Sequence, residues 1–304
     1  MVYILAAILV FGVLIAVHEL GHFMAAKACG VRVNEFSIGM GPALWKKQKG
    51  ETQYSLRLFP VGGFCAMEGE EEDSDDPAAL NNQGFWAKLL IFAAGAAMNF
   101  IAGLLIILAL YAGAKAFYEP VITGFADDCP LESAEGLQTG DRLLRIDGER
   151  VYMYSDVRLL LGLNKTGVFD LVVERNGEQV TLTDFPMPQQ TYTDQNGTSY
   201  TSYGLYFGAE EATLGRKLSY TWNNAVDFVR MVRLSLQMLV TGEAGVKDLS
   251  GPVGIVSTMT QVGEQSGSTR AAVENIAYLA ALIAVNLAVM NLLPLPALDG
   301  GKIF

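Results

Sequence analysis

The stretch VYILAAILVFGVLIAVHELGHFMAA, residues 2–26, decides the fold, because it joins a nearly unbroken apolar run to two histidines and a glutamate. An apolar run of this length can cross a bilayer as one helix. No lysine or arginine precedes Lys27, whereas a signal peptide would begin with a basic region. We therefore expect a retained transmembrane helix that carries the motif His18-Glu19-Leu20-Gly21-His22.

This motif has the spacing of a metal site. Residues four apart share one face of a helix, so His18 and His22 can offer two imidazoles to one ion. Glu19 lies beside that face, placed to take a proton from a water that the metal activates. Zinc suits the arrangement, because its catalytic sites use three protein ligands and one open position. Unpaired polar residues in a bilayer helix are costly, so helix packing alone is a poor explanation.

A third ligand must be of another type, because the chain has only two histidines. The best candidate is Asp299 in the run Asn291–Gly301, where Pro294 and Pro296 break an apolar segment. Broken segments are tolerated at membrane depth where they line a cavity. A carboxylate that only marks the membrane boundary would show the same pattern, and that alternative stays open. The need for a third ligand favours coordination by Asp299.

The composition indicates a membrane protein with three spans. Hydrophobic residues make up 51% of the chain and charged ones 17%, against about a quarter in soluble proteins. Two further uncharged runs, Leu89–Ala114 and Asn275–Leu298, are long enough to span. Tyr220–Val240 has helical spacing but three charges, so we expect an amphipathic helix on the membrane surface rather than a fourth span. Gly251–Ile255 predicts a rigid turn.

Charge and cysteine content narrow the partners. The net charge of −11 argues against binding nucleic acid. The three cysteines are widely spaced and form no CxxC pair, so we expect unpaired small residues. Basic residues gather between the first two spans, which places this loop in the cytoplasm and the N-terminus outside. These residues are Arg32, Lys46, Lys47, Lys49 and Arg57.

Several stretches have strand patterns. Gln53–Phe59 alternates like a strand, and Pro60–Gly63 predicts a turn. Leu143–Val151 and Phe169–Val180 each predict two strands joined by an Asp-Gly or Asn-Gly turn. We therefore expect a compact β-rich region outside the membrane, over Glu119–Pro188, followed by a polar loop over Pro188–Thr201.

With these motifs the chain resembles the site-2 protease family of intramembrane metalloproteases, specifically the bacterial RseP-type members with a PDZ domain. The HELGH motif and Asn291–Gly300 carry the resemblance, which covers nearly the whole chain. The pairing of HExxH with a distant Leu-Asp-Gly is highly specific. Supporting runs are Phe59–Phe64, Gly95–Asn99 and Gly251–Ile255.

The resemblance implies a zinc endopeptidase with His18, His22 and Asp299 as ligands and Glu19 as general base and acid. It implies that single-pass membrane proteins, anti-sigma factors or remnant signal peptides, are cut in the bilayer after a first cut by an upstream site-1-type protease. The expected location is the bacterial cell membrane. Matching substrate-handling positions are Asn286, Asn291, Pro294 and Pro296.

The implied fold is a polytopic α-helical membrane protein with a re-entrant β-hairpin and an inserted extracytoplasmic β-rich PDZ domain. The hairpin falls on Arg32–Met67, although an ordinary cytoplasmic hairpin fits the pattern too; its strand edge suits backbone pairing with an extended substrate. The run Cys129–Asp141, followed by Ile146–Gly148, resembles a PDZ domain. The resemblance implies that this domain acts as a size filter, which admits only substrates already trimmed by another protease.

The family has a further span after the Leu-Asp-Gly motif, and we expect that this last span is missing here. The expected domains are the first transmembrane helix with HExxH (1–27), the cytoplasmic-side loop with the hairpin (28–86), the second transmembrane helix (87–117), the PDZ domain (118–190), a loop with the amphipathic surface helix (191–272) and the third transmembrane helix with the Leu-Asp-Gly motif (273–304).

Two alternatives remain at this point. One is a membrane-anchored PDZ adaptor without protease activity, in which the HExxH motif is structural. The other is a membrane HExxH protease of another family, which would take its third ligand from a glutamate. Zinc content and the effect of Glu19→Gln test the adaptor, and zinc binding that survives Asp299→Ala would favour the other protease family.

Overall fold

The computed structural model describes residues 2–193, 197–242, 245, 251–296 and 298–303. The chain divides into two compact units. The membrane unit comprises Met1–Tyr111 with Phe228–Phe304, and the β-rich unit comprises Ala112–Asp227.

The membrane unit contains three helices that are long and apolar enough to cross a membrane. They are α1 (Val2–Ala28), α2 (Phe85–Ala112) and α6 (Thr269–Asn291). α6 ends three residues before Pro294, and this proline prevents the helix from continuing. The three expected apolar helices are confirmed, each long and apolar enough to cross a membrane.

Glycines let these helices approach closely. A Cβ at Gly21 of α1 would overlap the Ala94 carbonyl oxygen of α2, and one at Gly103 of α2 would lie 2.8 Å from Val285 Cγ2 of α6. Close backbone approach through small residues is typical of helix packing in lipid, where no hydrophobic effect drives association. The contact at Gly21 places the face of α1 that carries the HExxH histidines against α2.

A helix replaces the rigid turn expected at Gly251–Ile255. Gly251 is the N-cap of α5 (Pro252–Gln265), and the proline occupies the first helical turn. Proline is tolerated there because the first helical N–H groups have no partner within the helix. The remainder of α5 packs on α1, with Met259 in the same apolar cluster as Leu14.

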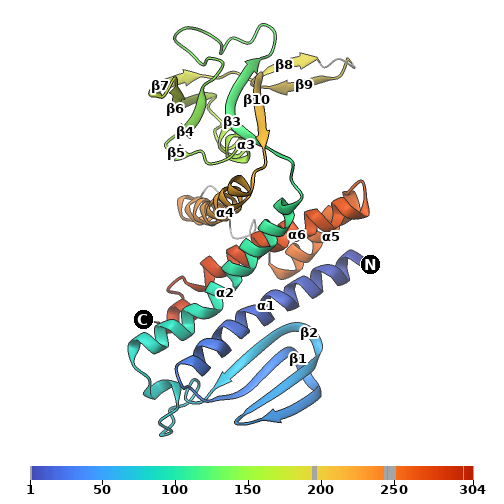
Figure 1. The fold of residues 1–304 in the computed structure, drawn as a ribbon, viewed down its shortest axis with the longest axis vertical. Coiled ribbons are helices and arrows are strands. Elements are labelled where there is room, and N and C mark those ends of the chain that lie inside the picture. Colours follow the sequence, from blue (N-terminus) through green and yellow to red (C-terminus); the bar gives the residue numbers. More distant parts are fainter. Residues whose placement is uncertain (1, 194–196, 243–244, 246–250, 297, 304) are drawn as a thin grey trace. The chain divides into compact units, whose positions relative to one another are not determined.

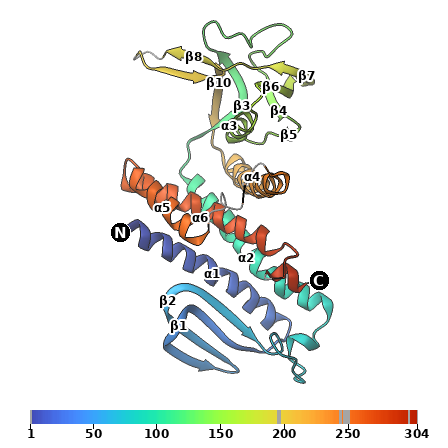
Figure 2. The same ribbon diagram turned by 180° about the vertical axis from the view of Figure 1, so that it is seen from behind.

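A long antiparallel pair, β1 (Val33–Lys49) and β2 (Thr52–Met67), lies along α1 (Figures 1 and 2). The strand expected at Gln53–Phe59 is confirmed, but the turn expected at Pro60–Gly63 is wrong, because these residues continue β2. Gly62 has a φ of +92°, and the register shifts beside it. The chain therefore bends through a bulge without leaving the sheet.

This bend creates an edge. Ser37 of β1 pairs with Phe64 on one side and with Ser55 on the other. The first part of β1 thus lies between two parts of β2, and Phe64–Met67 pairs through one side only among the described residues. Pro60, on the same strand, lies against Gly12 of α1, where a Cβ would overlap its carbonyl oxygen. The edge is held against the helix that carries the HExxH motif.

The β-rich unit is built on an antiparallel sheet of order β10-β3-β4-β6-β7, with β5 paired to β4. Both expected tight turns are confirmed: Asp147 and Asn176 have positive φ angles, as their Asp-Gly and Asn-Gly turns require. The elements are β3 (Ala116–Phe125), β4 (Arg142–Ile146), β5 (Glu149–Arg150), α3 (Tyr154–Leu163), β6 (Val168–Arg175), β7 (Glu178–Pro186) and β10 (Leu205–Glu211).

The polar stretch Pro188–Thr201 is not a plain loop. β8 (Gln190–Thr193) and β9 (Ser199–Ser202) pair within it, with residues 194–196 outside the described part. β10 then returns beside β3, so this unit extends past residue 190. The helix expected over Tyr220–Val240 is confirmed as α4 (Leu214–Thr241).

An ion pair in this unit gives a stability prediction. Asp141 is fully buried and accepts two hydrogen bonds from Arg175, at 2.8 and 2.7 Å, and one from the Gln138 N–H. Asp141→Ala is expected to lower the free energy of unfolding of this unit by about 3 kcal/mol, because a mostly buried guanidinium loses its counter-charge. Hydrogen exchange of the sheet amides in the full chain measures the loss.

Glu210→Ala is the matched control, because the Glu210–Arg216 pair is exposed. Its loss is expected to cost less than about 1 kcal/mol. Equal effects of the two substitutions would contradict the prediction.

Candidate metal centre

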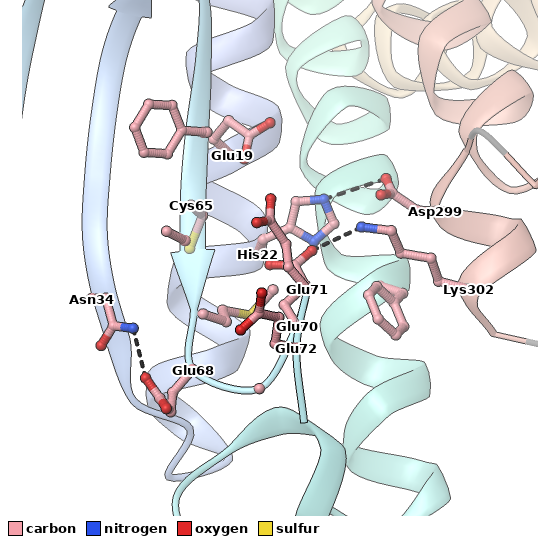
Figure 3. Close-up of a pocket in the computed structure, with 15 residues that line it drawn as sticks. Glu19, His22, Asn34, Cys65, Glu68, Glu70, Glu71, Glu72, Asp299 and Lys302 are labelled. Carbon is pink, nitrogen blue, oxygen red and sulfur yellow. Dashed lines mark hydrogen bonds and ion pairs between the residues drawn. The ribbon is translucent and has the colours of Figure 1, made fainter. Parts of the chain in front are cut away.

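Three atoms that can bind a metal, from residues far apart in the sequence, meet in the membrane unit. The Nε2 atoms of His18 and His22, one turn apart on α1, are 3.1 Å from each other. Asp299 Oδ2 lies 3.0 Å from His18 Nε2 and 3.3 Å from His22 Nε2, and Figure 3 shows it facing His22. Both histidines are buried. In the described part of the chain this is the cluster able to hold a metal ion.

The spacing of these atoms fits zinc. Ligand atoms about 2.0–2.1 Å from a tetrahedral zinc ion are about 3.3 Å apart. Two imidazole nitrogens and one carboxylate oxygen form a donor set that zinc accepts, with the fourth position left for water or substrate. Asp299 Oδ2 is itself buried, with the two imidazole nitrogens as its polar neighbours.

A glycine-rich turn presents Asp299. The 3-10 helix η3 (Asp299–Lys302) follows the proline-broken segment after α6. A Cβ at Gly300 would lie 2.5 Å from the Leu292 carbonyl oxygen, and one at Gly301 would lie 2.9 Å from the Pro296 backbone. Because only glycine fits against these backbone atoms, the two glycines allow the chain to fold back and place the carboxylate at the histidines.

Each histidine ring has a polar neighbour on its far side. His22 Nδ1 lies 2.8 Å from the Ile91 carbonyl oxygen of α2. A carbonyl only accepts, so the proton sits on Nδ1 and Nε2 is left free to bind a metal. His18 Nδ1 lies 3.4 Å from the amide of Asn99, also on α2. These two partners were not among the site residues expected from the sequence.

Gly95 of α2 makes room for the rings. A Cβ there would overlap His22 Nε2 and lie 2.7 Å from His18 Cε1. This close approach explains a glycine at the start of the run Gly95–Asn99.

Of the four residues expected to handle substrate, the structure places Asn291 beside His18. Asn291, the last residue of α6, has Nδ2 3.5 Å from both ring nitrogens of His18. Asn286 lies more than one turn earlier on α6, and its Oδ1 is buried without a hydrogen-bond partner among the described residues. Pro294 and Pro296 are exposed in the segment between α6 and η3.

A cavity of about 870 Å³ is lined by two of the three residues, His22 and Asp299. Glu19 lines it, and Gly63 of β2 is so close that its Cβ would lie 3.6 Å from Glu19 Cγ. The edge Phe64–Met67 and the acidic run Glu68–Glu72 form another wall (Figure 3). Lys302 Nζ reaches Glu70 Oε1 at 2.8 Å and ties η3 to that wall. The Glu19 side chain, two of the three candidate ligand residues and a strand edge thus share one cavity.

Comparison with known proteins identifies the family. The sequence pattern of peptidase family M50 matches residues 6–304. A protein named as a zinc metalloprotease in Clostridium perfringens is 38% identical over 303 residues, covering 99% of this chain and 86% of the relative. A protein so named in Clostridium acetobutylicum is 37% identical over 303 residues, covering 99% and 85%. The Regulator of sigma-W protease RasP of Bacillus subtilis is 27% identical over 383 residues, covering 99% and 88%.

These findings do not favour an adaptor without protease activity or an HExxH protease of another family. The chain has three membrane-capable helices, matches the family pattern over nearly its whole length and has relatives named as zinc metalloproteases. It therefore belongs to peptidase family M50, the site-2 protease family, and is a zinc metalloprotease.

Proposed function

We propose that this protein is an intramembrane endopeptidase that cuts the transmembrane segments of single-pass membrane proteins. The observation that carries the proposal is the meeting of His18 Nε2, His22 Nε2 and Asp299 Oδ2 at 3.0–3.3 Å, on and beside membrane-capable helices. These three residues hold the zinc ion. A hydrolytic centre on such a helix acts on peptide bonds within the bilayer.

Glu19 is the proton carrier of the reaction. Zinc, when bound, would act as a Lewis acid that lowers the pKa of water and polarises the scissile carbonyl. Glu19, next to His18 in sequence and lining the same cavity, takes the proton of the attacking water. It then delivers this proton to the leaving amine, so that the peptide bond breaks without release of a charged amide.

The edge Phe64–Met67 holds the substrate in an extended form. A transmembrane helix hides its peptide bonds in its own hydrogen bonds, so it must unwind before water can attack. The edge lines the cavity, and the Cys65 backbone N–H faces the Glu19 carboxylate. A strand added here by backbone pairing has its peptide bonds beside the catalytic groups. Asn286, Asn291, Pro294 and Pro296 guide the unwound segment.

The β1–β2 pair is a re-entrant hairpin in this proposal, with the N-terminus outside and the β-rich unit a PDZ domain on the outer side. Such a domain filters out substrates that an upstream site-1-type protease has not yet trimmed. Anti-sigma factors and remnant signal peptides are the substrates, and the name of the Bacillus relative, a regulator of sigma-W, supports the first class. The domain boundaries are those expected from the sequence, with the outer unit extended to β10.

Reconstitution tests the proposal. The full chain is placed in lipid vesicles with a single-pass substrate, stripped of zinc with a chelator, and assayed before and after zinc is restored. Removal of zinc is expected to slow cleavage by at least about 100-fold, and zinc but not magnesium is expected to restore it, because the nitrogen-containing donor set disfavours magnesium. Undiminished cleavage by the stripped protein would contradict the proposal.

A further inference from the structure

We propose that Asn99 orients His18 as a zinc ligand, as the Ile91 carbonyl orients His22. This inference rests on the zinc centre of the proposed function. It makes Asn99 a positioning residue, because it acts on the metal through His18.

The surroundings of Asn99 call for an explanation. Asn99 lies in the middle of α2, in a stretch without charged residues, and is 1% exposed. Its Nδ2 is 3.4 Å from His18 Nδ1. Its Oδ1 is buried and has no hydrogen-bond partner in the described part of the chain. A buried amide oxygen without a donor is unfavourable, and such groups usually have a functional reason.

The chemistry of imidazole gives that reason. A neutral ring carries one proton, so Nε2 can bind a metal only when the proton is on Nδ1. With Nδ2 toward the ring, the Asn99 amide donates to Nδ1 and thereby requires the proton on Nε2. Turning the amide by about 180° exchanges its two ends, which are nearly the same in size. Oδ1 then accepts the Nδ1 proton, and His18 Nε2 is free to face Asp299 and the metal.

The two histidines therefore differ in how their protons are fixed. The main-chain carbonyl of Ile91 can only accept, so His22 keeps its proton on Nδ1 whether or not a metal is bound. His18 depends on a side-chain amide that can either donate or accept. Metal binding thus selects one orientation of Asn99, and partners of this kind are worth about 10–100-fold in metal affinity.

Asn291 does not serve the same purpose. Its Nδ2 is 3.5 Å from both Nδ1 and Nε2 of His18. An amide in line with one ring nitrogen would be clearly farther from the other, so Asn291 is in line with neither and does not fix the proton. Asn291→Leu is therefore a matched control that removes a neighbouring amide from the same ring.

Because the chain has only two histidines, ¹⁵N-histidine labelling yields two imidazoles, one for each ligand. The full chain is measured in detergent micelles, zinc-free and zinc-loaded, together with its zinc affinity by competition titration. In the wild type we expect zinc to move the His18 proton to Nδ1 and to leave the His22 proton where it was. A wild type in which neither histidine responds to zinc would overturn the zinc centre itself.

Three variants test Asn99. Asn99→Leu is expected to weaken zinc binding by about 10–100-fold and to change the ¹⁵N signals of His18 alone. Asn99→Asp keeps an acceptor and is expected to restore affinity to within about threefold of the wild type. Asn291→Leu is expected to leave the His18 proton on Nδ1. Zinc affinity of Asn99→Leu within about threefold of the wild type, or equal changes at both histidines, would overturn the role of Asn99.

Discussion

Glu19→Gln is expected to lower the rate of cleavage by at least about 10²–10⁴-fold and to leave zinc bound. The amide has nearly the size of the carboxylate but cannot take a proton from water. Glu19 lines the cavity and is not among the three atoms that meet at 3.0–3.3 Å, so its loss removes proton transfer and leaves the ligands in place.

The measurement is single-turnover cleavage of a model transmembrane substrate in vesicles, with the zinc content of each variant determined in parallel. Glu72→Gln is the matched control, because Glu72 is an exposed carboxylate that lines the same cavity. This control is expected to retain the wild-type rate to within about threefold, since it transfers no proton in the reaction. Equal rates for wild type and Glu19→Gln would remove the catalytic role of Glu19.

The sequence predicts the parts of the fold that depend on length and local periodicity. An uncharged run must form a helix in lipid, so α1, α2 and α6 follow from composition. The turns at Asp147 and Asn176 follow because these residues and glycine tolerate positive φ.

Where proline and glycine have two structural uses, the prediction fails. At Pro60–Gly63 they form a bulge within β2, and at Gly251–Ile255 the proline begins α5. Which use applies depends on the neighbouring element, here α1 in both cases. Alternation along Gln53–Phe59 likewise could not show that β1 lies between two parts of β2.

The site divides in the same way. The histidine spacing is a property of one helix, and the proline break before Asp299 is visible in the chain, so these three residues can be found without a structure. Ile91 acts through its backbone carbonyl, which every residue has, so the sequence could not single it out. Asn99 does leave an indication, because an asparagine in an uncharged span needs a partner. The sequence does not show which face of α2 packs against α1. That packing makes His18 the partner of Asn99.

Asp299→Ala is expected to weaken zinc binding by more than about 100-fold, which exceeds the cost of losing a hydrogen-bond partner of a ligand, and to abolish cleavage at physiological zinc. Among the described residues that could hold the ion, the substitution removes the one that offers an oxygen and leaves two imidazoles, which are too few for a catalytic zinc site. Zinc affinity by competition titration and cleavage in vesicles measure the two effects.

Asp73→Ala separates coordination from charge, because Asp73 is an exposed aspartate that directly follows the acidic run Glu68–Glu72 and does not line the cavity. Both variants lose one negative charge, but only Asp299 lies within 3.3 Å of the two histidines. If the Asp73 variant keeps the wild-type zinc affinity and the Asp299 variant loses it, coordination holds the metal and the general field of the acidic groups does not. Full zinc binding by Asp299→Ala would instead require another oxygen ligand, and Glu70, which faces Lys302 across the same cavity, would be the first residue to test.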